Sequence, residues 1–355
     1  MRVVNVRLRA AALLSVSLVW AASVAAQTNE LHLVEELRLG TADGMGPDVF
    51  GDIHDVAVDS SGRIYVLDPG WKEVRLFDRE GGFIRRLAPE GDGPGERRHR
   101  TQFPARVTWD ERRGLLWIDD SVLQSVLDSV GVEHARSTRV PNLLRNPTQA
   151  ITVVMAVDRR GRVYEQQYRV FGDSTYSYVA RGGTTQDYAL SGDTLRIDAR
   201  AMATEGARRT VETASASTRG TMTLTMSRPT RAQIAWTASP EGTVWLADHD
   251  RPRLHELTIS GDTIRTVDVP LGHPEELDVS PEGWIWVRRT TDPDQSAWDV
   301  LDNCGVHVGT TSVSYPVTVT EVGSAGIIHV VASDRLDIEY VVRLRVDTRV
   351  SRRSC

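Results

Sequence analysis

Lysine is almost absent from this chain of 355 residues, because Lys72 is the single lysine among 42 basic residues. The other basic residues are arginines, and together with abundant alanine, valine, glycine and aspartate they indicate the codon bias of a GC-rich genome. The net charge is −6, whereas proteins that bind nucleic acids usually present a concentrated basic surface. The composition therefore argues against a nucleic-acid partner.

Long apolar runs and long amphipathic helical patterns are also missing after the first 26 residues. Apolar residues make up 40% of the chain and charged residues 25%, which is typical of a soluble globular protein. We therefore expect no membrane span in the mature chain.

Residues 1–26 have the pattern of an export signal. The positively charged start contains Arg2, Arg7 and Arg9, and residues 10–19 form an apolar stretch. Small residues then follow at Val24, Ala25 and Ala26, as a signal peptidase requires. The apolar stretch is shorter than the roughly 20 residues of a membrane span, although an uncleaved anchor is the alternative. No cysteine lies near the expected cleavage site before Gln27, which argues against a lipid anchor. We expect an exported protein, either periplasmic or extracellular.

Cysteine occurs twice, as Cys304 and Cys355, and both residues would remain after removal of a signal peptide. Exported proteins can form disulfides, and two is the smallest even number of cysteines. Cys355 ends a short tail, residues 351–355, which could reach a partner nearby. A Cys304–Cys355 disulfide is one possibility, and two unpaired thiols are the other.

A short phrase recurs six times along the chain. It consists of an acidic or small residue, a tight turn, a glycine, and then a strand with an aliphatic and usually an aromatic residue. The clearest copy runs from Asp59 through Gly62 to Tyr65, and the six glycines are Gly62, Gly114, Gly161, Gly242, Gly283 and Gly326. Glycine suits the positive φ of such a turn, and the aromatic residue suits packing between sheets.

The spacing of the six glycines predicts the architecture. The first two intervals are 52 and 47 residues and the last two are 41 and 43. Periods of about 40 to 50 residues with four strands in each unit are typical of a β-propeller. The third interval, 81 residues, contains residues 199–228, which have few large apolar side chains. We read this segment as a loop insertion and predict a six-bladed all-β propeller of four-stranded antiparallel blades over residues 27–350. Seven blades are the alternative.

The ring also needs a means of closure. The sixth unit, near residues 317–346, lacks one strand, and residues 31–39 could form either a helical turn or a strand. We predict that they complete the sixth blade as its outer strand.

Several stretches resemble the bacterial exported six-bladed β-propellers that are related to NHL-repeat proteins. They are DVAVDSSGRIYVLD (55–68), VRLFDREGGFIRRL (74–87), GDGPGE (91–96), WTASPEGTVWL (236–246) and DRLDIEYVVRLRV (334–346). The resemblance covers nearly the whole mature chain and implies a propeller fold and an exported location. Such propellers often serve as binding platforms, and their relatives include amidating lyases and lactonases. The chain departs from the pattern at Ser239 and Ser280, where aspartate is more common.

Candidate site residues follow from the repeat. In a propeller the first strand of each blade lines the central channel, so residues that enter these strands should gather at one mouth. Counting back from the repeated turn places polar residues there in three units: His54, Asp55, Arg106, Glu275 and Glu276. We expect a polar ligand-binding mouth. A metal held by His54, His273 and Glu275 is the alternative, and solvated or mutually paired groups are the plainest interpretation.

Other motifs indicate no particular chemistry. The aspartate-rich turns lack the alternating acidic spacing of a calcium loop, and residues 91–96 lack the ending of a phosphate-binding loop. No Gly-x-Ser-x-Gly motif is present. We therefore predict a non-catalytic binding scaffold without a cofactor, for an unknown protein, glycan or small ligand. A metal-dependent hydrolase or lyase with its site in the channel is the alternative.

Overall fold

The computed structural model describes residues 29–98, 105–120, 123–138, 151–171, 174–181, 194–197, 235–247, 252–269, 274–292 and 294–347. The regular secondary structure in these ranges consists of β-strands only. No helix in them is long and apolar enough to cross a membrane. The expected export signal, the expected insertion at 199–228 and the tail at 351–355 lie outside the described residues.

The described strands form six four-stranded antiparallel sheets. The first contains β2 (Asp55–Val58), β3 (Ile64–Asp68), β4 (Glu73–Phe77) and β5 (Phe83–Leu87). The second contains β6 (Arg106–Asp110), β7 (Leu115–Asp119), β8 (Leu123–Asp128) and β9 (Glu133–Thr138). The third contains β10 (Ile151–Val157), β11 (Val163–Phe171), β12 (Ser174–Arg181) and β13 (Thr194–Ile197).

The fourth sheet contains β14 (Trp236–Ala238), β15 (Val244–Ala247), β16 (Arg253–Leu257) and β17 (Thr263–Asp268). The fifth contains β18 (Glu276–Val279), β19 (Ile285–Asp292), β20 (Gln295–Leu301) and β21 (His307–Val313). The sheet that closes the ring contains β22 (Val317–Val322), β23 (Ile327–Ser333), β24 (Glu339–Val346) and, from the start of the chain, β1 (Leu33–Leu39).

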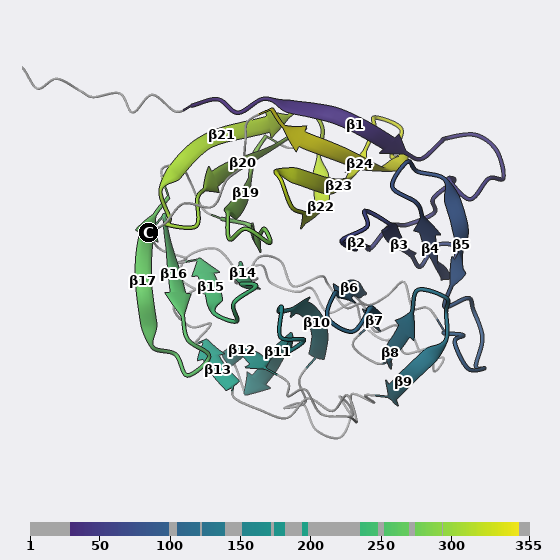
Figure 1. The fold of residues 1–355 in the computed structure, drawn as a ribbon, viewed down its shortest axis with the longest axis horizontal. Coiled ribbons are helices and arrows are strands. Elements are labelled where there is room, and N and C mark those ends of the chain that lie inside the picture. Colours follow the sequence, from purple (N-terminus) through teal and green to yellow (C-terminus); the bar gives the residue numbers. More distant parts are fainter. Residues whose placement is uncertain are drawn as a thin grey trace, which may run out of the picture.

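The sheets are arranged around a common centre as the blades of a propeller (Figure 1). The first strand of each blade lies innermost, and each of these inner strands contacts the inner strand of the next blade, β22 and β2 included. The outer strands β5, β9, β17 and β21 lie at the rim (Figure 1). The prediction of an all-β propeller with four-stranded antiparallel blades is confirmed.

The repeated phrase forms the turn between the first two strands of a blade. In the first blade, Asp59 accepts hydrogen bonds from the backbone N–H groups of Ser61 and Arg63, each at 3.0 Å, so it shapes its own turn. Gly62 has φ 83°, a conformation that favours glycine. The Tyr65 hydroxyl then donates to Asp59 at 3.2 Å, which ties the following strand to the turn.

The core consists of six apolar clusters, each lying between two neighbouring blades. The aromatic residue of the repeated phrase is almost fully buried in five blades, as Tyr65, Trp117, Tyr164, Trp245 and Trp286. In the closing blade His329 occupies this position and is also buried, with 3% of its surface exposed. Because the core lies between blades, no blade buries its own faces, and the ring has to close to complete the last seam.

The ring is closed by pairing of the two ends of the described chain. β1 pairs antiparallel with β24, with Leu33 opposite Val346 and Leu39 opposite Val341. Leu39 is buried in the apolar cluster between the closing and first blades. The prediction that residues 31–39 supply the outer strand of the sixth blade is therefore confirmed for β1.

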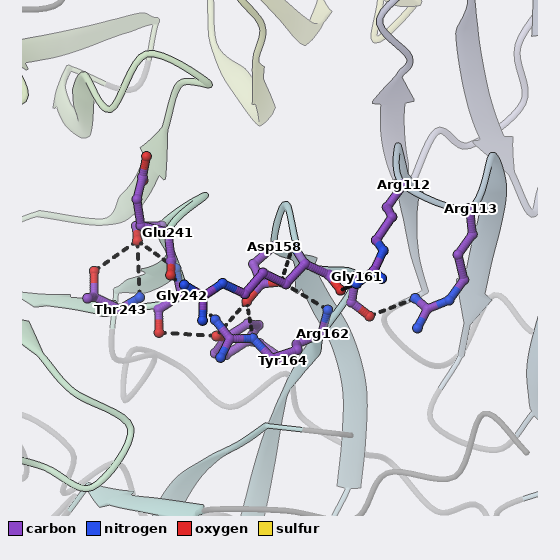
Figure 2. Close-up of polar contacts among 11 residues, drawn as sticks. Arg112, Arg113, Asp158, Gly161, Arg162, Tyr164, Glu241, Gly242 and Thr243 are labelled. Atoms are coloured by element: carbon purple, nitrogen blue, oxygen red, sulfur yellow. Dashed lines mark hydrogen bonds and ion pairs between the residues drawn. The ribbon is translucent and has the colours of Figure 1, made fainter. Parts of the chain in front are cut away.

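At the end of the ring that carries the repeated turns, which we call the turn end, neighbouring blades are joined by hydrogen bonds. Figure 2 shows the second to fourth blades: Arg113 donates to the Gly161 carbonyl oxygen at 2.6 Å, and the Tyr164 hydroxyl donates to that of Gly242 at 3.2 Å. Arg159 of the third blade donates to the Pro281 carbonyl oxygen of the fifth blade, past the fourth. The turn end is thus built from contacts between turns.

Candidate functional site at the ring axis

The predicted residues of the channel mouth occupy equivalent places in three blades. Asp55, Arg106 and Glu276 are the first residues of β2, β6 and β18, and His54 and Glu275 immediately precede two of these strands. They lie at the end of the ring opposite the turn end, as the repeat predicted. Binding of a ligand by these residues remains a prediction.

Asp55 joins the first and second blades. Its carboxylate accepts the backbone N–H of Val107 at 2.9 Å and a guanidinium hydrogen bond from Arg106 at 3.4 Å. Only 6% of Asp55 is exposed. Burial raises the pKa of Asp55, while the Arg106 charge and the Val107 N–H oppose that rise.

Glu276 belongs to a second ion pair, with Arg288 of β19. The Arg288 Nε donates to the Glu276 carboxylate at 2.7 Å, and its Nη1 donates to the Val317 carbonyl oxygen at 2.8 Å. Val317 begins β22, so Arg288 connects the fifth blade to the closing blade. Part of the predicted mouth is therefore paired internally, as the plainest interpretation of the sequence allowed.

Two further carboxyl groups lie on the inner strands, and the sequence reasoning missed both. Asp278 follows Glu276 by two residues on β18, and Glu321 lies near the end of β22. We call Asp55, Glu276, Asp278 and Glu321 the axial cluster. A carboxyl residue inside an inner strand was the available signal, but counting only at the strand entrances did not test these positions.

Burial raises the pKa of Asp278 to about 7, and the negative charges of Glu276 and Asp55 add to the rise. Burial likewise raises the pKa of Glu321 well above its usual range, and repulsion from Asp278, Asp55 and Glu276 adds to it. Both residues are half-buried.

His54 pairs with Asp52, which is not a member of the axial cluster. Its Nε2 is 3.1 Å from Asp52, and its buried Nδ1 has no hydrogen-bond partner among the described residues. His273, the other histidine of the metal alternative, lies outside the described residues. Within the described ranges no group of three or more histidine, cysteine, aspartate or glutamate side chains has the arrangement needed to hold a metal ion.

The closing blade has an unusual polar row next to the cluster. The strand register places Glu321 opposite His329, and His329 opposite Arg343. Burial, with a contribution from the Arg343 charge, lowers the pKa of His329 to about 3, so its imidazole is neutral at pH 7. Neither ring nitrogen of His329 has a hydrogen-bond partner in the described part of the chain.

Of the two cysteines in the predicted disulfide, the structure describes only Cys304. Cys304, in the turn that follows β20, is disulfide-bonded. Cys355, its predicted partner, lies outside the described residues, so the pairing remains a prediction.

No protein-family description matches this chain, and no curated protein matches it. Solved structures do match in fold. A candidate exported protein from Bacteroides fragilis has a TM-score of 0.52 at 10% sequence identity, over 90% of this chain and 96% of that chain. Virginiamycin B lyase from Staphylococcus aureus has a TM-score of 0.50 at 10% identity, over 89% of this chain and 99% of that chain.

A member of a family of unknown function from Bacteroides vulgatus also has a TM-score of 0.50 at 10% identity, over 91% of this chain and all of that chain. At such low identity these likenesses establish the class of fold, a β-propeller, and carry no activity over to this chain.

Proposed function

We propose that this protein is a non-catalytic binding propeller whose ligand meets the ring axis at the end where the inner strands begin. The observation that supports this most is that the axial cluster, Arg106 and Arg288 come from neighbouring strands around the ring axis. Such a set offers acceptors and donors at fixed positions, which suits the few polar groups that orient a ligand in a pocket. The ligand class we propose is a polar small molecule or glycan, or a polar segment of a protein.

We further propose the finer features that the sequence predicted. Six described blades and the contacts between neighbouring inner strands support a six-bladed ring for the whole chain, with residues 199–228 as an insertion. The resemblance to exported NHL-related propellers and the pattern of residues 1–26 support export. The bonded state of Cys304 supports a bridge to Cys355.

The proposal can be tested with defined probes on the mature protein. Soluble peptidoglycan fragments, chitooligosaccharides and short charged peptides would be screened by thermal shift, and any hit would be measured by calorimetry. We expect Arg106→Gln and Glu276→Gln to weaken binding by about tenfold or more, the usual cost of a charged hydrogen bond. Arg85→Gln, on the exposed outer strand β5, is the matched control and should bind as the wild type does.

Two results would contradict the proposal. One is a probe whose affinity is the same in all three variants, because its site would then lie away from the axis. The other is turnover of a probe by the purified protein, or stoichiometric zinc or calcium in elemental analysis, which would favour the hydrolase or lyase alternative.

A further inference from the structure

Trp71 differs from the other tryptophans of this chain in its exposure. Within the described ranges it alone has more than half of its surface exposed, 55%, whereas the others are buried or partly buried. It lies in the turn between β3 and β4, at the end of the ring where the inner strands begin, because Leu67 near the end of β3 pairs with Asp55 at the start of β2. The exposed indole therefore belongs to the same end of the molecule as the predicted channel mouth.

A single exposed apolar side chain needs no explanation by itself, but a buried polar group fixes the position of this one. Asp68 is buried, and its carboxylate accepts the backbone N–H of Trp71 at 3.1 Å. The same carboxylate accepts the backbone N–H groups of Gly51 and Asp52, at 2.9 Å and 3.0 Å. One side chain thus ties the turn of Trp71 to the loop that leads into β2.

The turn and the loop also touch directly, at two glycines. A Cβ atom on Gly70 would lie 2.7 Å from the backbone nitrogen of Asp52, and one on Gly51 would lie 3.0 Å from Cδ1 of Trp71. Glycine allows this close approach, so the edge of the indole lies next to Asp52. The Asp52 side chain is 46% exposed, and its carboxylate is 3.1 Å from Nε2 of His54. Asp52 therefore connects the indole to the predicted mouth.

The Arg75 guanidinium lies over one face of the indole, 5.7 Å from the ring centroid. Only 2% of Arg75 is exposed, and its position is fixed by the Glu73 carboxylate at 2.6 Å and the Pro47 carbonyl oxygen at 2.9 Å. The exposed surface of Trp71 is therefore the opposite face and the ring edge. Its Nε1–H makes no hydrogen bond to another described residue.

These surroundings favour one kind of ligand for the free face. A cationic ligand is disfavoured, because Arg75 already interacts with the ring and Lys72, the next residue, adds a positive charge beside it. A wholly apolar ligand would remove the charged group of Asp52 from water without a new partner. A sugar ring meets neither obstacle, because its C–H face can stack on the indole while its hydroxyl groups donate to the Asp52 carboxylate.

We propose that Trp71 is the stacking platform for one sugar ring of a glycan, and that the Asp52 carboxylate binds hydroxyl groups of the same ring. The inference deepens the proposed function and rests on it, because it selects the glycan among the ligand classes of that binding propeller. Since Asp52 also contacts His54, a longer saccharide bound at Trp71 extends toward the ring axis.

Calorimetry of the mature protein with hexasaccharides of glucose, of N-acetylglucosamine and of galacturonic acid tests this inference. We expect at least one to bind, Trp71→Ala to weaken its binding by about tenfold or more, and Trp71→Phe, which keeps an aromatic face, by about threefold or less. Asp52→Asn should weaken it by about tenfold through loss of a charged hydrogen bond. Phe83→Ala is the matched control, because Phe83 is another exposed aromatic residue, on the outer strand β5, and this variant should bind as the wild type does.

Nuclear magnetic resonance of the wild type gives a second measurement that does not depend on the folding of the alanine variant. The indole N–H signal of Trp71, assigned by its loss in Trp71→Phe, should shift when the saccharide binds. The inference would be overturned if none of the three hexasaccharides bound, or if the bound one had equal affinity for the wild type and Trp71→Ala. A shift of the Trp71 signal with adenosine monophosphate or a proline-rich peptide, and with none of the saccharides, would overturn it too.

Arg106→Gln and Glu276→Gln separate this inference from the proposed function at the ring axis. If these variants weaken the binding of a probe that Trp71→Ala does not affect, the axial site stands and the sugar platform is wrong. If Trp71→Ala weakens saccharide binding and the two axial variants do not, the platform stands and the axial site is wrong.

Discussion

Leu39→Ala would test whether a single buried side chain of β1 helps to hold the ring closed. Leu39 ends β1, has 5% of its surface exposed, and packs in the cluster that contains Ile53, Val331 and Val341. Replacing a buried leucine by alanine costs about 3 to 5 kcal/mol through lost burial and a residual cavity. We take the lower end, about 3 kcal/mol, because β1 is an outer strand whose neighbours can relax into the space.

The assay is thermal unfolding of the mature protein, followed by circular dichroism. For a chain of this size each kcal/mol lowers the midpoint by about 2 °C, so Leu39→Ala should lower it by about 6 °C. Val34→Ala is the matched control within the same strand, because 41% of Val34 is exposed. A surface change of this kind should alter stability by about 0.5 kcal/mol or less.

The reasoning would be refuted if the two variants lowered the midpoint equally. Equal effects would mean that β1 contributes by its backbone pairing alone and that Leu39 does not pack between the blades. Deletion of residues 27–40 provides the upper limit, and it should lower the midpoint further than Leu39→Ala. An unchanged midpoint after the deletion would mean that the pairing of β1 with β24 does not stabilise the ring.

Three further outcomes are expected. Asp59→Ala removes the carboxylate that organises the first repeated turn and should cost about 2 to 4 kcal/mol in urea unfolding, whereas Asp262→Ala in an exposed turn should cost about 1 kcal/mol or less. Because the folded-state pKa of Asp278 is raised to about 7, its stabilisation is complete below about pH 4 and is lost as the pH rises through 7. Asp278→Asn should therefore stabilise the protein at pH 8, by at most about 4 kcal/mol at 1.4 kcal/mol per pKa unit, and little at pH 4. Alkylation without reductant should label neither Cys304 nor Cys355 in the intact mass, and two labels would exclude the bridge.

The repeated turn was recognisable in the sequence because its chemistry is local. Asp59 and Gly62 act on residues within a few positions of themselves, through side-chain hydrogen bonds to the backbone and a positive φ. The spacing of such turns then predicted four-stranded blades around a ring. Closure by residues 31–39 could also be predicted, because a propeller with an incomplete last blade requires a strand from elsewhere.

The candidate site was predictable only in part. Repeat counting placed Asp55, Arg106 and Glu276 correctly at the starts of their strands, because equivalent positions in a repeat protein occupy equivalent places in space. It did not reveal that Arg288 pairs with Glu276, because Arg288 belongs to the second strand of the blade. Glu321 was missed as well, since it lies in the least regular copy of the repeat.

The sequence by itself therefore determined the blade, its turns and the way in which the ring closes, since each follows from residues close together or from a repeat period. The tertiary structure decided which charged side chains come together at the axis of the ring. Asp55 and Glu321 are far apart along the chain and influence each other because the ring brings the first and last blades together. Whether a carboxyl group keeps its proton depends on this surrounding charge and on burial, and neither can be read along a single strand.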